Sequence, residues 1–256
     1  MKIAIVTGAS SGMGREFVLQ LPQYAEVDEI WAIARRQQAL ETLASESGVP
    51  VRPVLLDLCK EESFSALAAM LEKEQPDVRL LVNAAGFGKF GAYHKVSLEE
   101  ECRMIDLNCK ALVAVTRIVL PFMHRGSHVL QLARNSSWQP VPYITTYGAT
   151  KAMVLSYSRA LNRELKSRGI AVTAVCPFWT KTPFFDRAID PDREPVVKQY
   201  DVMYDPGDVV ALAWRDAKRG RDMSKYGAVA RFQGALAKLL PHSFVMSYWM
   251  KQQKLK

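Results

Sequence analysis

The chain has 256 residues, of which 49% are hydrophobic, and this is long enough to bury a full core. Its formal net charge is +8, but residues of both signs are interleaved over most of its length, so we expect no nucleic-acid partner. No apolar run approaches the ~18 residues of a membrane span. The four cysteines lie far apart and the four histidines share no ligand spacing, which indicates a cytoplasmic protein with reduced thiols and no metal site.

Short apolar runs alternate with longer amphipathic segments through most of the sequence. The predicted strands are Lys2–Val6, Glu29–Ala34, Val51–Leu56, Arg79–Val82, His128–Leu132 and Ile170–Val175. The predicted helices are Arg15–Leu21, Gln38–Ser45, Ser63–Glu74, Leu98–Phe122 and Tyr147–Arg168. This order is typical of βαβ units, in which helices cover both faces of a parallel sheet. The sequence therefore predicts an α/β fold with one doubly wound, Rossmann-type parallel sheet, in a single domain over residues 1–256.

The pattern loosens after Pro177, where further prolines stand among charged residues. We expect residues 183–205 to form an excursion over the carboxyl edge of the sheet, where open α/β sheets bind their ligands. A helix is predicted at Pro206–Lys218, and apolar residues at helical spacing predict a helical tail over residues 227–256. The tail is interpreted as packing on the molecule or on a second subunit, with contact to a membrane surface as the alternative.

A glycine-rich segment follows the first predicted strand directly and runs into the first predicted helix. It contains Gly8, Ser10, Ser11, Gly12, Met13 and Gly14. Glycines there permit a tight turn and a close approach of the backbone to a pyrophosphate, and the helix N-terminus offers free N–H groups and the positive end of its dipole. The segment predicts a nicotinamide dinucleotide site.

The second predicted strand is followed by Arg35 and Arg36 rather than by a carboxylate. An acidic residue at this place binds the ribose 2′-hydroxyl of NAD, whereas an arginine can hold the 2′-phosphate of NADP. Arg15, which directly follows the glycine turn, is expected to add a cation near the same phosphate. The sequence therefore favours NADP(H) as the cofactor, with NAD(H) as the alternative.

Tyr147 and Lys151 stand four residues apart at the start of a predicted helix, so both project from one face. An ammonium beside a phenol favours the phenolate and lowers the tyrosine pKa, which suits the tyrosine to donate a proton to a carbonyl oxygen. A tyrosine and a lysine at this spacing are common in helices. The pair therefore indicates a catalytic role only if other motifs accompany it.

Five motifs occur together in chain order: the turn from Thr7 to Gly14, the segment Asn83–Gly86, Asn108, the Tyr147–Lys151 pair and Pro177. In this order they resemble the classical short-chain dehydrogenase/reductase family over about residues 1–185.

The resemblance implies a role for each matching residue. Tyr147 would be the acid/base, Lys151 would lower its pKa and bind the nicotinamide ribose, and Asn108 would hold a water in a proton relay. The implied cofactor contacts are Asp57 and Leu58 at the adenine, Asn83, Ala84, Ala85 and Gly86 beside the cofactor, Pro177, and Thr180 and Thr182 at the carboxamide and phosphates. The family usually has glycine after that proline. Here Phe178 and Trp179 follow, and they either line the nicotinamide pocket or serve only as packing residues.

One position departs from the family. The active-site serine, about 13 residues before the tyrosine, is replaced by Arg134. A serine there hydrogen-bonds the substrate carbonyl; Arg134 can still donate hydrogen bonds and remains a catalytic candidate, but its bulk can fill the pocket. Ser136 or Ser137 would take over if the loop bulged by two residues.

The sequence thus predicts an NADP(H)-dependent oxidoreductase that interconverts a ketone and a secondary alcohol. Phe178, Trp179, Phe184 and Phe185 favour an apolar small-molecule substrate, steroid-like or acyl. The alternative is an NADPH-binding protein with impaired or no turnover, because Arg134 closes the carbonyl site. The family resemblance also implies a homo-dimer or homo-tetramer.

Overall fold

The computed structural model describes residues 1–190, 194–200 and 202–255. Residues 191–193 and 201 of the predicted excursion, and the last residue of the predicted tail, lie outside the described residues. Within the described part of the chain, no helix is both long enough and apolar enough to cross a bilayer.

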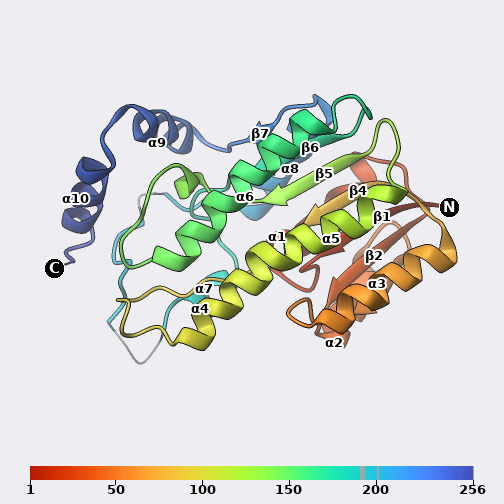
Figure 1. The fold of residues 1–256 in the computed structure, drawn as a ribbon, viewed down its shortest axis with the longest axis horizontal. Coiled ribbons are helices and arrows are strands. Elements are labelled where there is room, and N and C mark those ends of the chain that lie inside the picture. The colour runs from red at the N-terminus through yellow and green to blue at the C-terminus, as the bar shows by residue number, and fades with distance from the viewer. Residues whose placement is uncertain (191–193, 201, 256) are drawn as a thin grey trace.

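Seven strands form one sheet in which every pairing is parallel (Figure 1). Their order is β3-β2-β1-β4-β5-β6-β7. The strands are β1 (Lys2–Thr7), β2 (Glu29–Ala34), β3 (Val51–Leu55), β4 (Asp77–Asn83), β5 (His128–Leu132), β6 (Ala171–Val175) and β7 (Met223–Ser224). The chain winds outward from β1 in both directions, so the predicted doubly wound α/β fold is confirmed. The point where the winding reverses, between β1 and β4, is where such sheets bind ligands.

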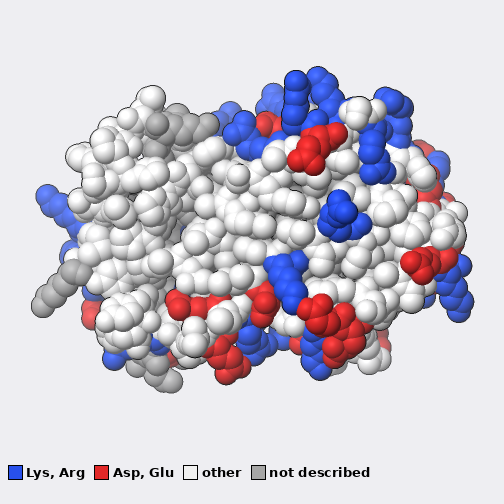
Figure 2. All heavy atoms as spheres, viewed as in Figure 1, with Lys and Arg blue, Asp and Glu red and all other residues white. Residues whose placement is uncertain are grey.

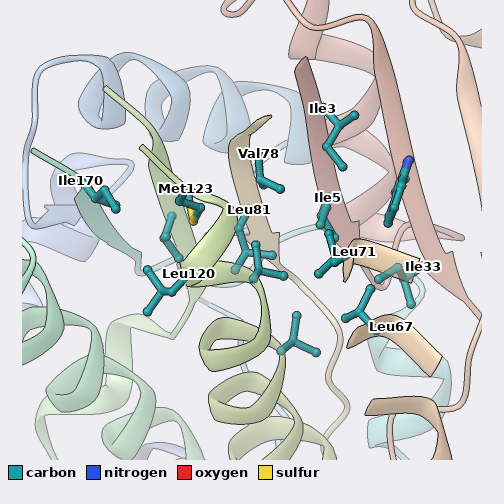
Figure 3. Close-up of a cluster of buried hydrophobic side chains, with 14 of the residues drawn as sticks. Ile3, Ile5, Ile33, Leu67, Leu71, Val78, Leu81, Leu120, Met123 and Ile170 are labelled. Atoms are coloured by element: carbon teal, nitrogen blue, oxygen red, sulfur yellow. The ribbon is translucent and has the colours of Figure 1, made fainter. Parts of the chain in front are cut away.

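Helices bury an apolar layer on each face of the sheet. On one face lie α1 (Gly12–Gln20), α2 (Gln37–Glu46) and α8 (Pro206–Lys218), which pack against alternate strand residues such as Ala4 and Val6. On the other lie α3 (Glu61–Glu74), α5 (Ala111–Val119) and α6 (Thr145–Glu164), which cover Ile3, Ile5 and Leu81 (Figure 3). Because successive strand side chains point to opposite faces, strands buried on both sides need the near-continuous apolar runs seen in the sequence.

The long helix predicted over Leu98–Phe122 is interrupted. The structure has α4 (Leu98–Ile105), a π-helical turn (Asp106–Lys110), α5 and a 3₁₀ turn (Leu120–Phe122). The π turn carries Asn108, and such turns are frequent at functional sites. Apolar periodicity runs on through the turn, which is why the sequence pattern predicted one continuous helix.

Near the C-terminus, two elements were not predicted, and the predicted helical tail is divided in two. A short helix, α7 (Phe184–Ala188), lies inside the predicted excursion, and β7 is too short to give a periodic signal. The tail forms two helices, α9 (Ala228–Leu239) and α10 (His242–Gln252), with Pro241 between them. Both helices stand at the left end of the molecule, the end toward which the strand arrows point (Figure 1).

Candidate active site

The glycine turn joins β1 to α1 in a conformation that requires glycine. Gly8 has φ +67° and Gly12 has φ +54°, in the left-handed region. A Cβ on Gly8 would lie 2.7 Å from the Ala85 Cα, and one on Gly14 would lie 2.3 Å from the Gly8 carbonyl oxygen. The turn is therefore pressed against the loop after β4, and the N-terminus of α1 faces the cavity above the sheet edge.

Gly14→Ala is expected to destabilise the protein by about 1–3 kcal/mol, because the new methyl group would overlap a backbone carbonyl that cannot move freely. Urea unfolding measures the change. Gly148→Ala is the matched control: its Cβ would meet no atom within 4 Å and it lies in α6, so it should be neutral or stabilising. Equal unfolding free energies for the two variants would contradict the tight packing of the turn.

A cavity of about 480 Å³ extends from this turn across the carboxyl ends of the strands. Eighteen of the twenty predicted cofactor residues line it: Gly8, Ser10, Ser11, Gly12, Met13, Gly14, Arg35, Arg36, Asp57, Leu58, Ala84, Ala85, Gly86, Tyr147, Lys151, Pro177, Thr180 and Thr182. Two lie elsewhere. Arg15 forms an ion pair with Glu46, and Asn83 is buried and donates to the Thr116 Oγ1 at 3.0 Å.

Three arginines surround one end of this groove. The Arg36 guanidinium donates to the Ser10 hydroxyl at 3.1 Å and to the Ser10 carbonyl at 3.2 Å, so it is fixed beside the glycine turn. Arg35 lines the groove next to it. Arg187 on α7, which sequence reasoning missed, stacks its Cζ 3.5 Å from the centre of the Phe87 ring. Burial and the charges of Arg35 and Arg103 lower the pKa of Arg187, as expected for cations gathered at an anion site.

Tyr147 and Lys151 lie at the other end of the groove, on one face of α6. Both are buried, at 5% and 4% exposure. The Lys151 Nζ lies 5.8 Å from the centre of the Tyr147 ring and donates to the Leu132 carbonyl at 2.6 Å, at the end of β5. The helix and the strand end thus hold the phenol and the ammonium together, as the spacing in the sequence predicts.

The charges around the phenol differ from expectation. Burial raises the pKa of Tyr147, while the charge of Arg134 and its hydrogen bond to the phenol lower it. Arg134 is thus a cation that opposes burial at the phenol, in addition to Lys151, to which the family resemblance gives this role. Burial, with a smaller contribution from Arg134, lowers the pKa of Lys151 to about 8.

Asn108 lies behind the groove rather than in its lining. Its Oδ1 accepts from the Phe87 N–H at 3.0 Å, and its Nδ2 donates to the Phe87 carbonyl at 2.9 Å and to the Thr150 hydroxyl at 3.1 Å. The π turn thus fixes the loop after β4, where Gly86 passes so close that a Cβ would lie 2.9 Å from the Asn108 Oδ1.

Arg134 lies directly beside the phenol. It is 9% exposed, and its Cζ is 5.5 Å from the centre of the Tyr147 ring and 4.0 Å from that of Trp179. The serines after it do not replace it: the Ser137 hydroxyl accepts from the Arg134 N–H at 3.1 Å, and Ser136 lines a different cavity. Arg134 therefore occupies the place beside the tyrosine that a substrate-binding hydroxyl would take.

The groove fits a nicotinamide dinucleotide in its shape and its charges. A helix N-terminus and three arginines suit the phosphates, while the buried tyrosine and lysine at the far end suit a ribose and a reacting carbonyl. Of the two aromatics after Pro177, Phe178 lines the groove, and Trp179 packs against Phe90 and Arg134.

Comparison with known proteins agrees with this geometry. A family model described as short chain dehydrogenase matches residues 2–192. The NADP-dependent 3-hydroxy acid dehydrogenase YdfG of Salmonella typhi is 31% identical over 219 residues, which cover 83% of this chain and 87% of that protein.

Solved structures share the fold. A short-chain dehydrogenase from Sphingobium yanoikuyae in complex with NADPH has a TM-score of 0.78 at 26% identity, covering 96% of each chain. A 3-ketoacyl-(acyl-carrier-protein) reductase from Brucella melitensis complexed with NADH has a TM-score of 0.73 at 26% identity, covering 88% of this chain and 96% of that one. Similar chains thus hold either nicotinamide cofactor.

Proposed function

Because the chain belongs to the short-chain dehydrogenase family and is an oxidoreductase of that family, we propose that it uses NADP(H) to interconvert a ketone and a secondary alcohol on an apolar substrate. The observation that carries the proposal is the buried Tyr147–Lys151 pair, which closes the inner end of a groove that begins at the glycine turn.

The proposed reaction needs one hydride and one proton. The nicotinamide, when bound, supplies the hydride to the carbonyl carbon. Tyr147 donates its phenolic proton to the carbonyl oxygen and recovers it from solvent. The Lys151 ammonium and the Arg134 guanidinium, both close to the phenol ring, stabilise the negative charge left on its oxygen. Asn108 is proposed to support this end of the groove by fixing the Phe87 backbone, and to hold the water of a proton relay.

Aromatic side chains around the phenol support an apolar substrate. The ring centres of Phe184 and Phe90 lie 5.2 Å and 6.0 Å from that of Tyr147. They exclude water from the place where charge develops on the carbonyl oxygen, which strengthens the hydrogen bonds made there. Loss of NADPH absorbance with a panel of apolar ketones tests the proposal. If NADPH stabilises the protein but no ketone is reduced, the chain is instead a cofactor-binding protein whose carbonyl site Arg134 has closed.

NADP(H) is proposed over NAD(H) because Arg35 and Arg36 directly follow the second strand, at the place where a carboxylate would bind the ribose 2′-hydroxyl of NAD. Replacing both arginines with serine should weaken NADPH binding at least about tenfold and leave NADH binding within about twofold, because only NADPH loses charge-assisted hydrogen bonds. Calorimetric titration measures both affinities. Arg215→Ser on α8 is the control, and an equal loss for the two cofactors would contradict the assignment.

A further inference from the structure

Arg134 stands between two cavities. The first is the cofactor groove, and the second, of about 370 Å³, lies under α9 and α10. Arg134 and Phe178 line both cavities, so the guanidinium is shared between the place of the reacting carbonyl and the space beneath the tail helices.

The second cavity is mostly apolar, with one charged residue in its lining. Side chains from the loop before α6, from α9 and from α10 form its walls, among them Val141, Ile144, Leu236, Leu240, Phe244 and Trp249. Neutral polar groups complete the lining, chiefly glutamines and Ser136. Among the described residues that line it, Arg134 is the only charged one. On the face that Figure 2 shows, the described surface at this end of the molecule is also largely uncharged.

The charge of Arg134 has no anionic partner within the described residues. Its hydrogen bond goes to the Tyr147 phenol and its face stacks on Trp179, 4.0 Å from the ring centre. A guanidinium has five N–H donors, so several stay available toward the second cavity. A cation that is nine-tenths buried without a carboxylate is unfavourable, and a bidentate pair with an incoming carboxylate relieves that cost.

We infer that the second cavity binds the apolar chain of an organic acid whose carboxylate pairs with Arg134. The ligand class is a medium-chain carboxylic acid. We further assign this acid as the substrate: an apolar oxo or hydroxy acid whose oxo or hydroxyl oxygen reaches Tyr147. This assignment rests on the proposed function. The binding site itself rests only on the cavity, its apolar wall and the buried guanidinium. Arg134 then takes the place of the family's serine because it recognises an anion.

Binding of decanoate to the full chain, without cofactor, tests the site. Tryptophan fluorescence is a suitable readout because Trp179 and Trp249 both line the cavity. Decanoate should bind at least about tenfold more tightly than decanol, since only the carboxylate forms charge-assisted hydrogen bonds with the buried guanidinium. Arg134→Met should abolish this preference by weakening decanoate and leaving decanol unchanged, while the control Arg215→Met on α8 should retain it. Equal binding of decanoate and decanol by the parent would overturn the inference.

A second variant keeps the test valid if Arg134→Met folds poorly. Leu240→Asp introduces a negative charge into the apolar wall, and it should weaken decanoate more than decanol. Unchanged decanoate binding in this folded variant would show that the chain does not lie under α9 and α10, and would likewise overturn the inference.

Turnover separates this inference from the proposed function. NADPH consumption is compared for 3-oxodecanoate and its methyl ester. A preference for the acid that is lost in Arg134→Met supports both. If the ester is reduced as well as the acid, the proposed function holds and the carboxylate site is wrong. If decanoate binds with the expected preference but neither ketone is reduced, the site holds and the proposed function is wrong.

Discussion

Tyr147→Phe is expected to lower kcat for ketone reduction by about 10²–10⁴-fold, the usual contribution of a positioned general acid. The ring of the variant still fills the space between Phe90 and Phe184, so the groove should keep its shape. NADPH should therefore stabilise the variant against heat about as much as it stabilises the parent.

The control for this substitution lies on the same helix. Tyr157→Phe removes a phenol oxygen from α6 at a half-buried position outside the groove lining, and it should leave kcat unchanged. If Tyr147→Phe kept the turnover of the parent, another group would be the proton donor and the role given to Tyr147 would be wrong.

Lys151 should make both activity and stability depend on pH. Its pKa of about 8 means that the ammonium is lost as pH rises through that value, so kcat should fall above pH 8 by up to tenfold per unit. Between about pH 8 and 10.5 the unfolded chain binds more protons than the folded protein, so the unfolding free energy should rise with pH, by up to about 3 kcal/mol from this group.

Two variants isolate the effect of Lys151. In Lys151→Met the rise in unfolding free energy between pH 8 and 10.5 should disappear, and at pH 7 the variant should be more stable than the parent although inactive. Lys151→Arg keeps its charge over the whole range, so any activity that it retains should not fall near pH 8. A parent whose unfolding free energy is flat over this window would contradict the burial of a titrating ammonium.

Much of the fold and the groove could be predicted from the sequence because the signals there are local. Apolar runs such as Ile3–Val6 mark buried strands, and the glycine-rich segment marks a turn whose packing leaves no room for a side chain at Gly8 or Gly14. Tyr147 and Lys151 are one helical turn apart, so their shared face follows from the helix itself.

The surroundings of Tyr147 could not be predicted in the same way. Arg187 reaches the groove from α7, a five-residue helix with no periodic signal, and the π turn at Asn108 lies within an unbroken apolar pattern. The effect of Arg134 on Tyr147 depends on how the loop after β5 folds back against Trp179. Such contacts join segments far apart in the chain, and no local pattern encodes them.

The measurement that tests this account most directly is transfer of deuterium from NADPH labelled at the reactive C4 position to a ketone, followed by mass spectrometry of the alcohol. We predict one deuterium in each alcohol molecule that the parent forms, and about 10²–10⁴-fold less labelled alcohol with Tyr147→Phe under the same conditions. If the parent binds the labelled NADPH but no deuterium enters any alcohol across a panel of apolar ketones and oxo acids, the groove holds a cofactor without performing the reaction, and the central claim is contradicted.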